Sequence, residues 1–248
     1  MTRSRSEAMG PLYSQIKSHL LEAIESGQLR PGDRVPSERE LTTQFAVSRM
    51  TARQALTELE NMGRLVRIQG KGTFVATPKL TQSLASLTSF TEDMRSRGMV
   101  PGARVLAVGE EPASLRVATA LGIREGDRVI KVERLRLADG EPMALETSRV
   151  PADCCPDLLV SDLTDRSLYQ VLRERGVELA RATQSLEAVL ADGPEAEVLR
   201  VKDGAALLLL ERVSCDPQGR PVEYVRSLYR GDRYRFITEL IRRGGTTA

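Results

Sequence analysis

The sequence has 248 residues, of which 41% are hydrophobic and 28% are charged, a composition typical of a soluble globular protein with room for two modest domains. No apolar run approaches the ~20 residues of a membrane span, and no apolar segment follows the arginines of the first ten residues, so we expect a cytoplasmic protein. Three cysteines, two of them adjacent, and one histidine indicate neither a disulfide framework nor a zinc site. We therefore expect no metal and no cofactor.

Two helices are predicted at the start of the chain. In residues 11–26 apolar residues recur every four positions from Leu12 to Ile24, which is the spacing of one helical face. After a turn-rich connection, Ser37 and Glu40 form a capping box that begins a second helix ending near residue 45.

A short turn and a third helix come next. Ser48 is the expected N-cap of a helix that runs to about Met62. Residues 65–68 and 73–75 are β-rich and flank a Gly-Lys-Gly tip, as in a hairpin. The order of helix, helix, tight turn, helix and hairpin predicts a winged helix-turn-helix over residues 11–76.

The start of the third helix carries the candidate DNA contacts. At 100° per residue one apolar arc contains Ala52, Ala55, Leu56, Leu59 and Met62. Arg49 and Arg53 lie together just outside this arc, in the first turns, where recognition helices contact bases and phosphates. Ser48 can cap the helix or donate to a phosphate. Further candidates, on the second helix, the third helix and the hairpin tip, are Arg39, Thr51, Gly70 and Lys71.

A family resemblance agrees with this interpretation. The segment PSERELTTQFAVSRMTARQALTELENMGRLVRIQGKGTFVA resembles the DNA-binding domain of the GntR family of bacterial transcription regulators. The resemblance covers residues 11–76 and implies a homodimer on an inverted-repeat operator of double-stranded DNA. The operator contacts that it implies are Arg39, Ser48, Arg49, Thr51, Arg53 and Gly70.

The rest of the chain is predicted to be a linker and a second domain. Residues 77–102 are polar, with one short capped helix from about Ser89 to Arg97. In residues 103–240, neighbouring strands joined by hairpins favour an antiparallel α+β fold. The candidate strands are 103–110, 128–137, 143–150, 179–190, 206–214 and 222–230, and the candidate helices are 114–121, 166–175 and 194–200.

One strand of this domain suggests an anion site. Alternation along DRVIKVERLRLADGEP places Arg134 and Arg136 on the same face as Ile130 and Val132. Two such arginines need an anion, which is either a carboxylate of the protein or a phosphate of a ligand. Ser167 and Tyr169, at the start of a predicted helix, could complete a phosphate site, with ordinary salt bridges as the alternative.

The hairpin that follows leaves two registers open. A three-residue loop of Ala138, Asp139 and Gly140 would place Ala144 and Glu146 on the arginine face. A two-residue Asp-Gly loop would place them on the opposite face.

A second resemblance spans nearly the whole chain. The segments LTSFTEDMRSRG, ERLRLADGEPMALET, RSLYQ and VEYVRSLYRGDRYRF resemble the HutC subgroup, whose effector domain is called UTRA, and within it the N-acetylglucosamine-responsive repressors. The resemblance implies glucosamine-6-phosphate or N-acetylglucosamine-6-phosphate as the effector. The implied phosphate ligands are Ser89, Phe90 (backbone), Thr91, Arg134, Arg136, Ser167 and Tyr169. The implied sugar ligands are Glu146, Arg181, Glu223 and Tyr229.

We therefore expect an α+β protein, in which a winged helix-turn-helix precedes an antiparallel-sheet UTRA domain of chorismate-lyase-like fold. The expected function is that of a transcriptional repressor of amino-sugar uptake and use, released or modulated by a phosphorylated amino sugar and without catalytic residues. The alternatives are a HutC-type regulator of another metabolite, a lyase-like enzyme fused to a DNA-binding module, and a DNA binder without an effector. The sequence offers no nucleophile–base pair for the enzyme.

Overall fold

The computed structural model of the chain describes residues 11–240. Its contacts divide the chain into two compact units, with the division between Lys79 and Leu80. Each unit is described by itself.

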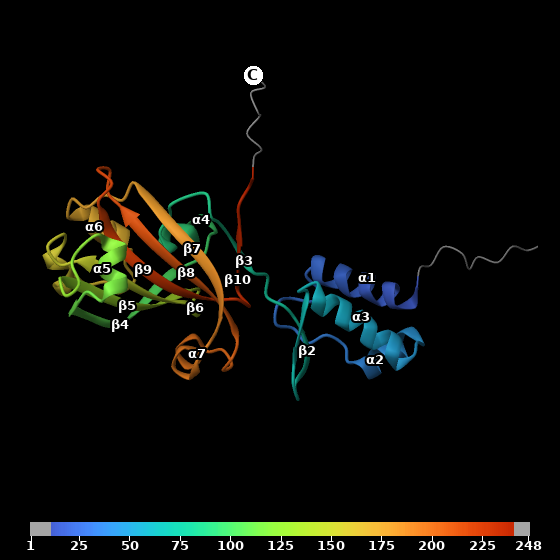
Figure 1. The fold of residues 1–248 in the computed structure, drawn as a ribbon. Coiled ribbons are helices and arrows are strands. Elements are labelled where there is room, and N and C mark those ends of the chain that lie inside the picture. The colour runs from blue at the N-terminus through green and yellow to red at the C-terminus, as the bar shows by residue number, and fades with distance from the viewer. Residues whose placement is uncertain (1–10, 241–248) are drawn as a thin grey trace, which may run out of the picture. The chain divides into compact units, whose positions relative to one another are not determined.

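The first unit has the predicted order of elements (Figure 1). Its elements are α1 Leu12–Glu25, α2 Glu38–Phe45, α3 Arg49–Asn61, β1 Leu65–Ile68 and β2 Gly72–Val75. The core between them contains Ile16, Leu20, Leu41, Leu56 and Leu59, which are all fully buried. Two residues assigned to apolar faces, Leu12 and Met62, are exposed instead, because they lie at helix ends beyond the packed region.

Caps define the turn between the second and third helices. The Ser37 hydroxyl accepts from the Glu40 amide at 3.3 Å, and the Ser37 amide donates to the Glu40 carboxylate at 2.7 Å, which confirms the predicted capping box. Ala46 ends α2 with a left-handed backbone (φ 50°), and Ser48 then caps α3 by accepting from the Thr51 amide. The chain therefore passes from the end of α2 to the start of α3 within three residues, and Glu38 of α2 contacts the first turns of α3 through Arg49 and Arg53.

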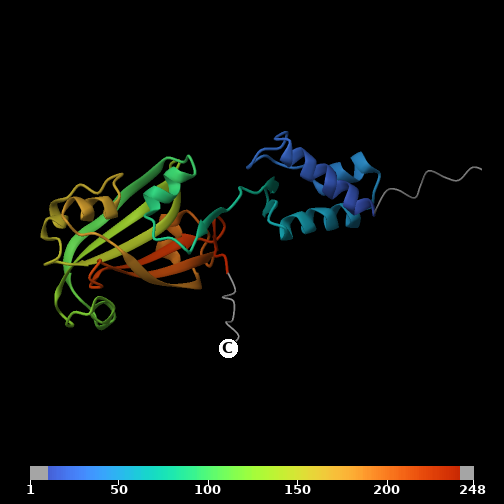
Figure 2. The ribbon, with the colours of Figure 1, turned by 90° about the horizontal axis from the view of Figure 1, so that it is seen from above.

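The second unit is built on a six-stranded antiparallel sheet in the order β4-β5-β6-β9-β8-β7 (Figure 2). The strands are β4 Pro101–Pro112, β5 Arg128–Ala138, β6 Glu141–Pro151, β7 Arg181–Leu190, β8 Ala206–Cys215 and β9 Pro221–Arg230. The helices are α4 Phe90–Ser96, α5 Leu115–Leu121, α6 Leu168–Glu174 and α7 Gly193–Leu199, with a 3-10 turn η1 over Pro156–Val160. The predicted antiparallel α+β fold is confirmed.

Residues 77–102, expected as a linker with one short helix, contain more structure than that. Leu80–Ser83 form a strand, β3, which pairs in parallel with β10, Tyr234–Ile237. The second compact unit thus begins at Leu80, and α4 packs within it through Phe90 and Met94.

Helices cover both faces of the sheet. On one face α6 packs against Ile130 and Val132, and α4 packs beside Tyr229. On the other face α7 packs against Leu135, and α5 packs against Val129. Alternation along β5 explains this division, because residues of even number face α4 and α6 and those of odd number face α5 and α7.

The hairpin between β5 and β6 resolves the register question in an unexpected way. The turn is the two-residue Asp139-Gly140 loop, both residues with positive φ, and it pairs Ala138 with Glu141. This loop alone would turn Glu146 away from the arginines. A β-bulge at Met143 shifts the pairing by one residue, so that Arg134 lies opposite Glu146. The expectation that loop length decides the face was therefore wrong.

Candidate functional site

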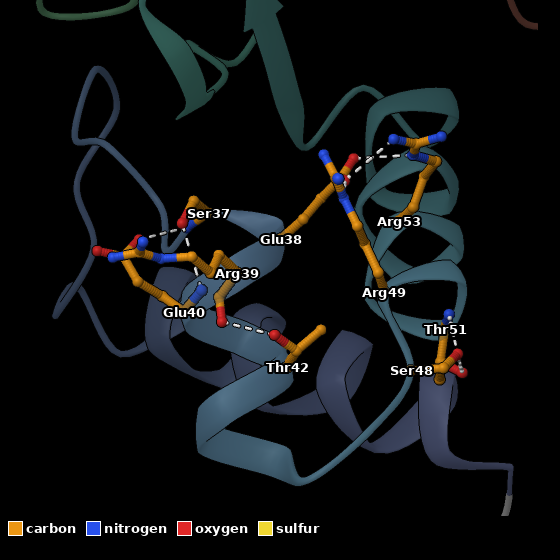
Figure 3. A network of polar contacts seen from close by, with 9 residues as sticks. All are labelled: Ser37, Glu38, Arg39, Glu40, Thr42, Ser48, Arg49, Thr51 and Arg53. Carbon is orange, nitrogen blue, oxygen red and sulfur yellow. Dashed lines mark hydrogen bonds and ion pairs between the residues drawn. The ribbon is translucent and has the colours of Figure 1, made fainter.

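The start of α3 presents two arginines that share one carboxylate (Figure 3). Glu38, the first residue of α2, accepts from Arg49 Nε at 2.8 Å, from Arg53 Nε at 2.9 Å and from Arg53 Nη2 at 3.2 Å. Hydrogen bonds from Arg53 and Arg49 lower the pKa of Glu38 to about 2, so this carboxylate is ionised at any physiological pH. The side chain of Arg49 remains 74% exposed.

The other predicted DNA contacts lie on the same unit. The Ser48 hydroxyl caps α3 and also bonds to the Thr51 hydroxyl at 2.8 Å. Gly70, with φ 76°, and Lys71 form the tip of the β1–β2 hairpin, and both are exposed. Arg39 is exposed near the start of α2.

A groove beside α3 adds two arginines that the sequence interpretation missed. It is lined by Arg34, Arg39, Arg49 and Arg67, together with Glu38 and apolar or small residues. Arg67 is exposed on β1, although it lies on the same face as the buried Leu65, and the backbone of Arg34 forms a bridge with that of Phe74 on β2. Neither arginine carries a periodic signal, because alternation would group Arg67 with the buried Leu65 and Arg34 lies in an irregular loop.

The second unit contains a cavity between the sheet and the starts of α4 and α6. Its lining includes nine of the eleven predicted effector residues: Ser89, Phe90, Arg134, Arg136, Glu146, Ser167, Tyr169, Glu223 and Tyr229. The lining also contains Thr88, Leu168, Leu210, Arg212, Val225 and Ser227. The period-2 alternation of the strands and the caps of the two helices therefore bring together residues from six segments of the second unit.

Arg136 is the least satisfied polar group of this cavity. Its side chain is 2% exposed, Nη2 donates to the Thr91 hydroxyl at 3.0 Å, and the guanidinium lies 4.6 Å from the Phe90 ring centroid. Nε and Nη1 are buried without a partner. Burial lowers the pKa of Arg136 to about 10, which leaves it charged at neutral pH. A buried cation with free donors is an anion-binding group.

Arg134 is partly compensated by the protein. It forms an ion pair with Glu146, and its Nη1 donates to the Arg166 carbonyl at 3.1 Å, while its Nε has no partner. Burial raises the pKa of Glu146, but attraction to Arg134 and Arg136 outweighs burial and lowers it overall. Both alternatives foreseen for the arginines, a protein carboxylate and a ligand, are thus compatible with the cavity.

The cavity also holds a second carboxyl group. Glu223 accepts from the hydroxyls of Ser148 and Ser214, each at 3.0 Å. Burial, and then repulsion by Glu146, raise the pKa of Glu223. Burial likewise raises the pKa of Tyr169 to about 12, so this phenol stays protonated as a donor.

Two predicted residues lie outside the lining, for different reasons. Thr91 reaches the cavity only through Arg136. Arg181 is exposed at the start of the edge strand β7. Gln184, three residues later, faces Arg212 of the cavity and accepts from its Nε at 2.9 Å, so alternation turns Arg181 to the other face. The structure does not bring Arg181 to the other predicted effector residues.

Arg212 is the main cavity residue that the sequence interpretation missed. It is buried, and its Nη1 donates to the Tyr169 hydroxyl at 3.1 Å. The signal was present in β8, where Leu208, Leu210, Arg212 and Ser214 share one face. With Arg212 included, three guanidinium groups meet one ionised carboxylate and one carboxyl of raised pKa, so the cavity is suited to an anionic ligand.

Family comparisons agree with both regions. The model described as "Bacterial regulatory proteins, gntR family" matches residues 12–75, and the UTRA domain model matches residues 96–235. The chain belongs to the GntR family.

Similar proteins place this GntR-family chain more narrowly. It is 41% identical over 227 residues to the HTH-type transcriptional repressor NagR of Bacillus subtilis (strain 168), covering 92% of this chain and 93% of that one. It is 35% identical to the histidine utilization repressor of Pseudomonas putida, with 92% of each covered. The crystal structure of PhnF from Mycobacterium smegmatis superimposes with a TM-score of 0.66 at 35% identity, over 94% of this chain and 100% of that chain.

This GntR-family protein is thus a transcriptional repressor of the HutC type, and it is a DNA-binding regulator rather than an enzyme. The predicted fold, a winged helix-turn-helix followed by a UTRA domain, is confirmed. Regulators of this kind bind operator DNA and a small-molecule effector. No helix among residues 11–240 is long and apolar enough to cross a membrane.

The raised pKa of Glu223 predicts a pH dependence of stability. Between its unfolded value near 4.5 and its higher folded value, the native state binds more protons, so stability falls as pH rises. Glu223→Gln does not titrate, so the melting temperature of the wild type should decline relative to this variant as pH increases above 4.5. Thermal unfolding of both proteins across a pH series measures the difference.

Glu174→Gln is the control of opposite sign. A hydrogen bond from Arg166 lowers the pKa of Glu174, so this carboxylate contributes stability above 4.5 that is lost as pH falls. If the difference in melting temperature between the wild type and Glu223→Gln does not change with pH, the raised pKa of Glu223 is contradicted.

Proposed function

We propose that this repressor acts as a homodimer on an inverted-repeat operator and that a phosphorylated amino sugar, glucosamine-6-phosphate or N-acetylglucosamine-6-phosphate, controls it. The observation that carries the proposal is Arg136, a buried guanidinium with two unpartnered donors in the lining of a cavity. Leaving such donors empty costs free energy, which a bound anion would recover. The similarity to NagR supports an amino sugar as the source of that anion.

The phosphate end of the ligand fits the arginine side of the cavity. Arg136 offers two free donors, and Arg134 offers one. The hydroxyls of Ser89, Ser167 and Tyr169 line the same cavity. A phosphate dianion accepts from several such donors at once, and charge-assisted bonds to guanidinium are strong and directional.

The sugar end fits the carboxyl side. Glu146 stays ionised and can accept from sugar hydroxyls or from an ammonium group. Glu223, with a raised pKa, and Tyr229 line the same cavity. Glu223 and Tyr229 add hydrogen-bonding capacity for a sugar ring. Arg181 has no part in this proposal, since it lies on the other face of β7.

The DNA end of the proposal rests on the exposed arginines of α3, with the hairpin tip as a backbone or minor-groove contact. A two-fold dimer would present two recognition helices about 34–36 Å apart, which is one turn of DNA. The groove residues Arg34 and Arg67 add positive charge to the same unit.

Arg49→Ala should weaken operator binding by about 1–3 kcal/mol and relax base preference, because a guanidinium reads guanine through two donors. Lys71→Ala should weaken binding to operator and scrambled duplex alike, because a phosphate contact carries no sequence information. Gel shifts on both duplexes at fixed salt compare the two variants. Unchanged operator affinity of Arg49→Ala would refute this contact.

Arg136→Met should abolish binding of the sugar phosphates without lowering the melting temperature of the ligand-free protein. The methionine fills a similar volume. The substitution removes two buried donor atoms that had no partner and loses one hydrogen bond, to the Thr91 hydroxyl, so the two effects on stability oppose each other. Arg181→Ala removes the same charge away from the cavity and should bind the ligand normally. Titration calorimetry with phosphorylated and unphosphorylated sugars gives the readout, and equal affinity for the two would argue against a phosphate site.

The proposed switch is a coupling between ligand and operator through α4. This helix follows β3 in the chain, and it meets the cavity through Phe90 on Arg136 and through Thr91. A ligand that draws Arg136 toward its phosphate would therefore change the contacts that hold α4. Such coupling is a free energy shared by both sites and must be reciprocal.

If the sugar phosphate weakens operator binding tenfold, about 1.4 kcal/mol, operator should weaken sugar-phosphate binding by the same factor. Calorimetric titration of the sugar phosphate into protein alone and into the operator complex measures both affinities, with a scrambled duplex as the control. The same ligand affinity with and without operator would rule out an allosteric repressor of this effector.

A further inference from the structure

We propose that Glu38 is a positioning residue for operator recognition, which holds Arg49 and Arg53 so that their Nη nitrogens face the DNA. The inference rests on the proposed operator contacts of these two arginines. It assigns a role to an acidic residue that itself contacts no base.

The geometry of the shared carboxylate carries the inference (Figure 3). Glu38 Oε2 accepts from Arg49 Nε and from Arg53 Nη2, and Oε1 accepts from Arg53 Nε, so the one carboxylate holds the Nε side of both guanidinium groups. Both Nη groups of Arg49 and the Nη1 group of Arg53 take no part in these bonds. Guanine is read through two parallel donors, and the outer edge of a guanidinium supplies such a pair.

Glu38 is itself held firmly, which a positioning residue requires. It is the first residue of α2, directly after the Ser37 cap, and its side chain is only 18% exposed. Long arginine side chains otherwise lose much rotamer freedom when they bind. A fixed carboxylate that orders two arginines before DNA arrives removes part of that cost.

Neither stability nor attraction to DNA explains a carboxylate at this position. Exposed ion pairs contribute little to stability. A negative charge beside the DNA-facing arginines also repels phosphates, so it should weaken binding that depends on charge alone. Positioning and charge therefore predict opposite effects of removing Glu38 on specific and non-specific DNA.

The test compares Glu38→Gln with Glu58→Gln in the full-length protein. Glu58 pairs with Lys17 at 2.7 Å on the same unit, so its variant makes the same charge change and also breaks an ion pair. Affinities for an operator duplex and a scrambled duplex of equal length are measured at several salt concentrations. Melting temperature and sugar-phosphate binding verify that each variant is folded.

We expect Glu38→Gln to lose at least about tenfold in the ratio of operator to scrambled affinity, the order of one good base contact. Its affinity for scrambled DNA should stay equal or rise. Glu58→Gln should keep the wild-type ratio. In an Arg49→Ala, Arg53→Ala background, Glu38→Gln should no longer change the ratio, because the side chains it positions are gone.

Other outcomes overturn the inference. If the ratio of operator to scrambled affinity is unchanged in Glu38→Gln, Glu38 has no positioning role. If both affinities rise by the same factor, Glu38 acts only by its negative charge. If both affinities fall by the same factor, Glu38 has a structural role. Arg49→Ala in the same assay distinguishes a wrong role for Glu38 from a wrong assignment of the operator contacts. If Arg49→Ala lowers the ratio and Glu38→Gln does not, only the role of Glu38 is lost.

Discussion

The structure depends on guanidinium groups that the protein satisfies only in part. In the sheet, Arg134 takes Glu146 as its counterion while its neighbour Arg136 keeps two buried donors free. At the start of α3, Glu38 binds the inner edges of two arginines and leaves most of their outer donors exposed. An arginine with every donor satisfied would be inert, and one with none would be costly to fold or to order. Partial satisfaction keeps each group both ordered and available to a further acceptor.

Much of this arrangement could be predicted because it follows from local periodicity. The caps at Ser37 and Ser48 define the helix pair, and alternation along β5 places Arg134 and Arg136 beside Ile130 and Val132 on one covered face. These features depend on residues close together in the sequence, so the sequence alone predicts them.

Two of the errors have a different origin, because they depend on pairing and packing that only the folded chain provides. A buried Met143 bulges out of register where it packs with Tyr229 and Tyr234, and no turn rule contains that information. The placement of Arg181 could not be predicted, because the face of β7 on which it lies is known only once the pairing of β7 with β8 places Gln184 opposite Arg212. Arg212 was overlooked in an apolar strand, although the same alternation that identified Arg134 would have identified it.

The pairing of β3 with β10 has a consequence for how the chain is made. The partners Leu80 and Tyr234 are separated by almost the whole second unit, yet their strands are neighbours in parallel. On a ribosome the three helices and hairpin of the first unit, whose contacts are close in sequence, emerge complete long before Tyr234 is synthesised. Strand β3, which follows the first unit, can pair only after β10 has been synthesised. A nascent chain therefore passes through a stage in which a finished DNA-binding unit is attached to a sensor that cannot yet close.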